Sequence, residues 1–239
     1  MDSMTLILFL CICVPILPVL VLLPDKRSRL FLGYLLIGVA VCLIAAEVNA
    51  LLLGLFHGNI RYVTTNYTPM VEEVLKGLAV LFYALCISDH RETVLSISLA
   101  VGLGFALLEN MVILTGNLEA VTVSWAIARG IGAALMHAAC TAMVGMGICY
   151  VRKRRKLFYC GTFSLLIAAV IFHGIFNALV QSEYRYLAFV WSAIMLLPQV
   201  VPIIRKKRRP SGRVRSDFHS ASRISMTGNR DKKQDDTGG

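Results

Sequence analysis

Five ionisable side chains lie inside stretches of the sequence that are otherwise apolar enough to cross a lipid bilayer. They are Glu72, Glu73, Glu109, His137 and His173. A charged side chain near the bilayer centre costs roughly 2.5 to 3.5 kcal/mol on insertion scales, so such residues usually mark a transport pathway or a chemical site. Carboxylates and imidazoles together can also bind a metal ion or activate a water molecule. These residue types predict a chemical site if they converge on one place.

The elements that would position these residues are apolar runs long enough to span a bilayer, which takes roughly 17 to 25 residues. The chain is 57% hydrophobic and 16% charged, whereas an ordinary soluble domain carries about 25% charged residues. Because the runs are continuous rather than alternating, we expect an all-α polytopic membrane protein. We count seven transmembrane helices, at 5–23, 30–56, 69–88, 93–114, 121–151, 157–180 and 187–204.

The basic residues between the runs predict the orientation of the chain. Taken alternately along the chain, one set of loops holds fourteen Lys and Arg, and the other set, which includes the N-terminus, holds only Arg61 and Arg185. Cytoplasmic loops carry the excess of basic residues. We therefore expect a multi-pass protein of the cell membrane with its N-terminus outside and its C-terminus in the cytoplasm.

Two regions are expected, a transmembrane domain over residues 1–204 and a cytoplasmic tail over residues 205–239. The tail holds eleven Lys and Arg against four Asp, which is +7 of the formal net charge of +10. Its composition is poor in apolar residues and predicts disorder. The basic run at 205–209 directly follows the last span, so it predicts binding to anionic lipid, and no nucleic-acid partner is expected.

With this orientation, the ionisable residues fall at compatible depths in the outer half of the membrane. At a helical rise of about 1.5 Å per residue, Glu72 and Glu73 lie roughly 5 to 6 Å from the outer end of their run. Glu109 lies about 8 Å and His173 about 10 Å deep, and His137 lies deeper. Structural ion pairs scattered through a bundle would have no reason to agree in depth, so we expect these residues to meet.

Helical spacing adds further polar residues to the group. His173 and Asn177 are four positions apart and share a helix face. Arg129 and His137 lie on one stripe of the fifth run whose other members are small, which is typical of a helix packed closely into a bundle.

Glu72 and Lys76 are also four positions apart, and we expect them to pair, with Glu73 turned toward another surface. Such a pair could equally be a structural feature of a helix end. Glu47 and Asn49 form a further polar spot on the second run, deeper than the others, and are expected either to be structural or to support the site residues.

Four short motifs follow one another on separate runs. They are EExxK at 72–76, FxxxEN at 105–110, an Arg followed by a His at 129 and 137, and HxxxN at 173–177. In this order, over about residues 30 to 200, the sequence resembles the PrsW family of intramembrane proteases, distant relatives of the CAAX prenyl endopeptidases and bacteriocin-immunity-type membrane proteins. CAAX-type relatives would carry EExxxR and FxxxH, so Lys76 and Glu109 favour the PrsW branch.

The resemblance implies an endopeptidase that acts on a membrane-anchored protein near the extracytoplasmic leaflet. PrsW-like proteins are described as making the first cut in an anti-sigma factor on that side of the membrane. The expected partner is a single-span membrane protein. This side of the membrane agrees with the depth obtained from the charge counts.

Peptide hydrolysis needs an activated water, stabilisation of the oxyanion and an acid for the leaving amine. Our hypothesis is that Glu73, or Glu72 with it, is the general base, and that His173 and Glu109 hold the water. The residues expected to orient these groups, donate to the oxyanion or balance charge are His137, Asn177, Arg129 and Lys76.

The water would be held either directly or through Zn²⁺ or another divalent metal, and both alternatives stay open. Two His and one Glu are a known catalytic zinc set, so a metal would be held by Glu109, His137 and His173, although HExxH is absent. A different class of function, proton- or cation-coupled transport, could use the same Glu/His residues as a relay. Transporter folds often contain internal repeats, and none is visible in this sequence.

Overall fold

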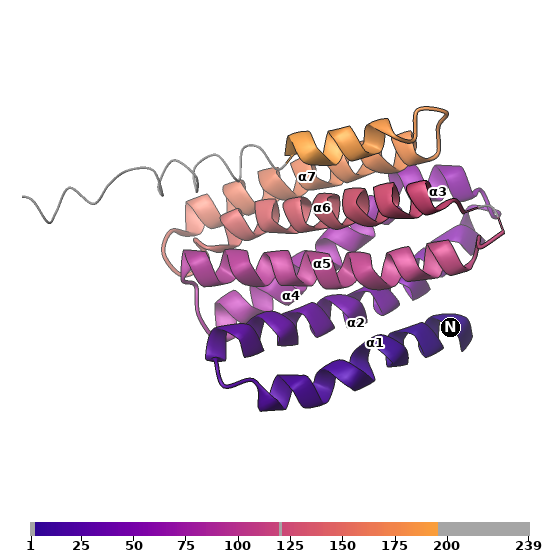
Figure 1. Ribbon diagram of the computed structural model, residues 1–239. Coiled ribbons are helices and arrows are strands. Elements are labelled where there is room, and N and C mark those ends of the chain that lie inside the picture. Colours follow the sequence, from indigo (N-terminus) through magenta and orange to yellow (C-terminus); the bar gives the residue numbers. More distant parts are fainter. Residues whose placement is uncertain (1–2, 120, 196–239) are drawn as a thin grey trace, which may run out of the picture. The chain divides into compact units, whose positions relative to one another are not determined.

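The computed structural model describes residues 3–119 and 121–195, and these residues form helices with no strand among them. In Figure 1 the long helices lie side by side and are joined by short connections. The helices are α1 (Ser3–Leu22), α2 (Lys26–Leu55), α3 (Ile60–Asn66), α4 (Thr68–Cys86), α5 (Arg91–Thr115), α6 (Val123–Ile148) and α7 (Arg155–Val180). Residues 187–195 are also helical.

Five of these helices, α1, α2, α5, α6 and α7, are long and apolar enough to cross a membrane. The first six runs expected from the sequence each coincide with a long helix, and the seventh begins at 187 as expected. The rest of that run and the tail at 205–239 lie outside the described residues. The short helix α3 was not expected, because it lies in a connection between two runs.

Local residue choices explain where several helices begin. Asp25 caps α2 by accepting a hydrogen bond from the Ser28 amide at 2.8 Å, and bonds from Ser28 hold the pKa of Asp25 below its ordinary value. Asn59 and Thr122 cap α3 and α6 in the same way. Pro69 stands in the first turn of α4, where its missing N–H would have no partner inside the helix.

The centre of the bundle is formed by α5 and α6, whose buried residues include many small side chains. A Cβ atom built on Gly102 of α5 would lie 2.6 Å from the carbonyl oxygen of His137 in α6. The two backbones therefore approach closely at the level of a predicted site residue. This contact fixes the height of His137 relative to α5.

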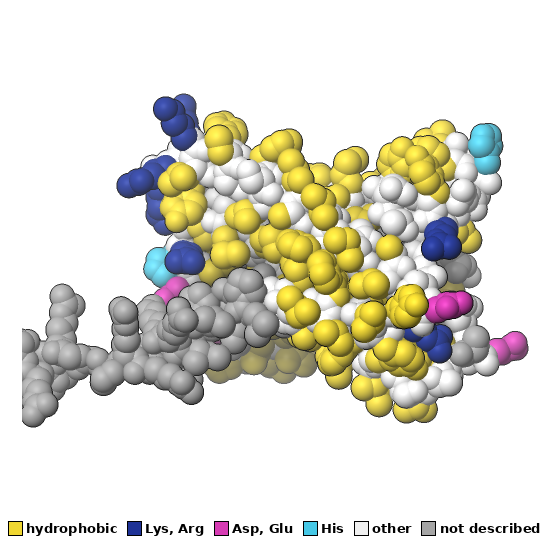
Figure 2. Space-filling view, turned by 90° about the horizontal axis from the view of Figure 1, so that it is seen from above, with side chains coloured by type: hydrophobic (Ala, Val, Ile, Leu, Met, Phe, Trp, Pro, Cys, Tyr) yellow, Lys and Arg dark blue, Asp and Glu magenta, His cyan; other side chains and the backbone are white. Residues whose placement is uncertain are grey.

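The surface of the bundle is strongly apolar. Long hydrophobic side chains such as Leu55, Phe82 and Ile127 are exposed. In Figure 2 hydrophobic side chains cover the middle of the visible face, whereas charged and histidine side chains lie toward its two ends. This distribution suits a protein whose middle contacts lipid and whose ends contact water.

Candidate active site

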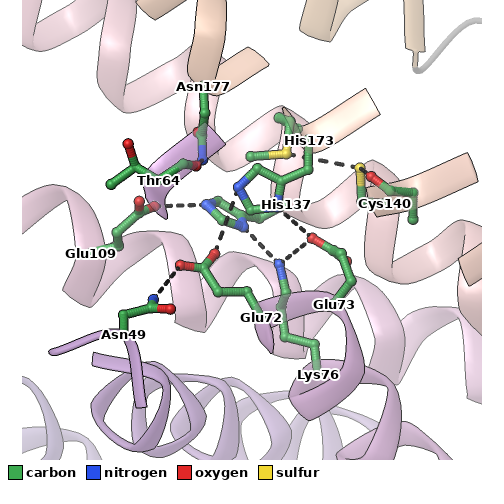
Figure 3. A network of polar contacts seen from close by, with 12 residues as sticks. Asn49, Thr64, Glu72, Glu73, Lys76, Glu109, His137, Cys140, His173 and Asn177 are labelled. Carbon is green, nitrogen blue, oxygen red and sulfur yellow. Dashed lines mark hydrogen bonds and ion pairs between the residues drawn. The ribbon is translucent and has the colours of Figure 1, made fainter. Parts of the chain in front are cut away.

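Four helices bring the predicted ionisable residues into one buried group, which Figure 3 shows from close by. We call this group the Glu/His cluster. It consists of Glu72, Glu73 and Lys76 from α4, Glu109 from α5, Arg129 and His137 from α6, and His173 from α7. Glu73, Lys76 and His173 have no exposed surface.

One oxygen of Glu73 joins α4 to α7. Glu73 Oε1 accepts a hydrogen bond from Lys76 Nζ at 2.6 Å and lies 2.8 Å from His173 Nδ1. Because a carboxylate oxygen can only accept, His173 Nδ1 must donate. A neutral His173 then carries its proton on Nδ1, so its Nε2 atom has a free lone pair.

Lys76 also determines which ring nitrogen of His137 carries a proton. Its ammonium nitrogen lies 2.8 Å from His137 Nδ1 and 4.6 Å from the centre of the Phe105 ring. An ammonium group can only donate, so His137 Nδ1 accepts and its Nε2 carries the proton. Nε2 donates to Glu109 Oε2 at 2.7 Å, and Arg129 Nη2 lies 3.7 Å from the other oxygen of Glu109.

The predicted pairing of Lys76 with Glu72 is wrong, since Lys76 pairs with Glu73 instead. The reason is that Glu72 faces α2, where Asn49 Nδ2 donates to Glu72 Oε1 at 3.4 Å. Of the two roles expected for Asn49, this contact favours support of a site residue. Its signal in the sequence was an amide side chain inside an apolar run, but the sequence did not show which residue it faces.

Two buried atoms of the cluster have no hydrogen-bond partner among the described residues and face each other. Neither Glu72 Oε2 nor His173 Nε2 makes a hydrogen bond to a described residue, and the two atoms lie 3.6 Å apart, within ion-pair distance of each other. In a tetrahedral zinc site with bonds of 2.0 to 2.2 Å, two ligand atoms lie roughly 3.4 Å apart. A divalent ion between these atoms would satisfy both of them.

A third residue can complete such a site. Glu72, His137 and His173 each offer one ligand atom, and these atoms all lie within 4.8 Å of one another. His173 also donates its other ring nitrogen to a carboxylate, as metal-binding histidines commonly do. One carboxylate and two imidazoles therefore fit a divalent metal.

This group differs in its carboxylate from the predicted ligands Glu109, His137 and His173, and the predicted set stays a prediction. In the structure Glu109 contacts His137 rather than the free atom of His173. His137 uses both ring nitrogens in hydrogen bonds, to Lys76 and to Glu109. To bind a metal directly, its ring would have to give up one of these two bonds.

Asn177 lies one turn beyond His173 on α7, but its amide is engaged elsewhere. Asn177 Nδ2 donates to the backbone carbonyl of Thr64 in α3 at 2.9 Å, and Figure 3 shows the two residues side by side. The structure thus brings a segment that the sequence left as a connection next to a predicted site residue. Short connections carry no hydrophobic periodicity, so nothing in the sequence indicated this contact.

Comparison with known proteins gives one match. A family model described as PrsW family intramembrane metalloprotease matches residues 26–204, a range that includes every residue of the Glu/His cluster. No curated protein and no solved structure matches the chain.

Proposed function

Because the chain belongs to the PrsW family of intramembrane metalloproteases and is thus a membrane-embedded peptidase, we propose that it cuts a single-span membrane protein near the extracytoplasmic leaflet. A first cut in an anti-sigma factor would be a reaction of this kind. The observation that carries the proposal is the pair of free buried atoms, Glu72 Oε2 and His173 Nε2, inside the cluster. Family membership favours hydrolysis over proton or cation transport by the same residues.

Glu72 and His173, with His137, would hold a divalent metal, for which Zn²⁺ suits a site of one carboxylate and two imidazoles. Bound there, the ion would supply a Lewis acid that activates water and polarises the substrate carbonyl. Glu73 fixes the ring of His173 through Nδ1. Once one ring nitrogen of His137 is turned over to the metal, the other would keep its bond to Lys76 or to Glu109 and hold the ring in place.

Glu73 also has the chemistry of a general base. Its Oε1 is engaged by Lys76 and His173, but its Oε2 is buried without a hydrogen-bond partner among the described residues. In the proposed reaction Glu73 Oε2 takes a proton from water as the water oxygen bonds to the peptide carbon. The same proton then passes to the amide nitrogen as the carbon–nitrogen bond breaks, so the carboxylate is regenerated.

The proposed topology has seven spans, with the N-terminus outside and the C-terminus in the cytoplasm. Two features support it beyond the five apolar helices, and the first is the distribution of the basic residues between the loops. The second is the orientation of α4, whose Glu72, Glu73 and Lys76 are buried while Leu78 and Phe82 are exposed. A helix of this kind can face lipid despite its three charges. The basic tail, which we propose binds anionic lipid, lies outside the described residues.

The test is to map the N-termini of membrane proteins in cells that express the wild-type chain or a variant. We expect new termini on the outer side of single-span proteins with the wild type, and none with Glu73→Gln or His173→Ala. Glu119→Gln, which changes an exposed glutamate in the same way, is the control and should behave as wild type. The same set of termini from wild type and His173→Ala would refute the proposal.

A further inference from the structure

A backbone carbonyl at the end of α3 accepts a hydrogen bond from a side chain that lies beside the Glu/His cluster. The Asn177 amide, one turn from His173, donates to the carbonyl oxygen of Thr64. Directly after the end of α7, Gln181 Nε2 donates to the Thr64 hydroxyl at 3.1 Å. The Asn177 amide could donate to a carbonyl oxygen of a substrate, but in the structure it already donates to a carbonyl oxygen of the protein itself.

The last turn of α3 has backbone carbonyl groups that are free to accept hydrogen bonds from outside the helix, as the carbonyl groups of an unfolded peptide are. Carbonyl groups in the last turn of a helix have no partner inside that helix. Pro69 follows Thr65 by four positions, and because proline has no N–H, it cannot donate to the Thr65 carbonyl. A Cβ built on Gly174 of α7 would lie only 3.1 Å from that same carbonyl oxygen. The absence of a side chain at Gly174 lets the backbone of α3 lie directly on α7.

We propose that the substrate binds as an extended main chain between α3 and α7, where one of its peptide carbonyls replaces the Thr64 carbonyl on the Asn177 amide. This inference rests on the proposed function and adds how the substrate reaches the site. Carbonyls inside a substrate helix are held in its own hydrogen bonds, so this contact needs an unwound segment or the free carbonyls of a helix end. One hydrogen bond to Asn177 is exchanged for another, so the exchange itself costs little.

A second consequence is that α3 must move away from α7 when the substrate binds. The bonds of Asn177 and Gln181 to Thr64 hold the closed arrangement, and the substrate carbonyl competes for the first of them. If Asn177 served only to cap α3, holding α3 permanently against α7 would leave hydrolysis unchanged. The two interpretations therefore differ in one measurable result.

The experiment ties α3 to α7 in a reversible way. In a chain whose seven native cysteines are replaced by alanine, Thr64→Cys and Gln181→Cys are joined by a bis-methanethiosulfonate cross-linker that dithiothreitol removes. The matched control joins Asp89→Cys to Lys153→Cys, since Asp89 Oδ2 and Lys153 Nζ lie 3.5 Å apart in two connections remote from the cluster. Each single cysteine variant, treated with the same reagent, controls for modification without a tether.

The probe is the whole membrane-protein fraction of the host cell, reconstituted with the purified protein in lipid vesicles. The readout is the yield of the new N-termini that His173→Ala does not produce. We expect the 64–181 tether to lower this yield at least tenfold and dithiothreitol to restore it, while the 89–153 tether has no effect. Equal yields with and without the 64–181 tether would overturn the inference and leave the proposed function standing. If the wild type gives no new termini, the proposed function fails and this inference fails with it.

A second variant tests the same inference, but here the yield of new N-termini is expected to rise. Gln181→Ala removes a bond that only the closed arrangement makes. The loss of one such hydrogen bond raises the open fraction by about two- to tenfold. We therefore expect the yield of termini to rise by up to that factor. A merely structural role of Gln181 predicts a fall instead, and a fall would count against the inference.

Discussion

Replacing the buried lysine with an apolar residue of similar length, Lys76→Met, should destabilise the protein severely. Lys76 has no exposed surface and donates to Glu73 at 2.6 Å and to His137 at 2.8 Å. Breaking a buried ion pair by removing one partner costs about 3 to 5 kcal/mol, because the other charge is left without compensation. For a chain of this size each kcal/mol lowers Tm by about 2 to 4 °C. The expected fall in Tm is therefore roughly 6 to 20 °C.

The double variant Glu73→Gln/Lys76→Met separates the loss of charge compensation from the loss of packing. It removes both charges of the Glu73–Lys76 pair, and the Gln oxygen can still accept from His173 Nδ1. We expect it to recover at least half of the Tm lost in Lys76→Met. The assay is thermal unfolding of the purified protein in detergent, followed by intrinsic fluorescence. If the Tm losses of the two single variants simply add in the double variant, within roughly 2 °C, the reasoning about a buried pair is refuted.

Three further predictions concern the metal. Asn49→Leu, which removes the donor to Glu72 Oε1, should weaken Zn²⁺ binding about 10- to 100-fold in a titration, and unchanged affinity would contradict its positioning role. His137→Ala and His173→Ala should each purify with far less metal than the wild type by elemental mass spectrometry, whereas Glu119→Gln should retain it. A zinc chelator should stop the production of new N-termini, and added Zn²⁺ should restore it; production that persists in the chelator would favour water activated by glutamate alone.

The convergence of the cluster could be predicted because helix rise and loop charge together fix depth. Glu72, Glu109 and His173 are far apart in sequence, but each lies a few residues from the end of its apolar run that is predicted to face outside. Buried charges are also costly unless they are paired, so residues at one depth are expected to face one another. These two arguments need no knowledge of the packing between helices.

The partner of each charge could not be predicted, because it depends on how each helix is rotated within the bundle. Helical spacing indicated Glu72 as the partner of Lys76, but Lys76 pairs with Glu73 in the structure while Glu72 accepts from Asn49. That contact depends on how α2 packs against α4, and the packing of two helices cannot be predicted from a local sequence pattern. The position of α3 was equally hidden, since it is held by the contact of Asn177 with the Thr64 carbonyl.

The distribution of the cluster over the chain has a consequence for biosynthesis. The ribosome delivers Asn49 and Glu72 early, whereas His173 comes seven residues before the end of α7. Chains fold progressively from their N-terminal side during synthesis, so a nascent chain released before α7 would have one imidazole of the metal-binding group and no complete site. Peptide hydrolysis at this group would thus become possible only after nearly the whole bundle has been inserted, and a chain terminated before α7 would lack the complete group.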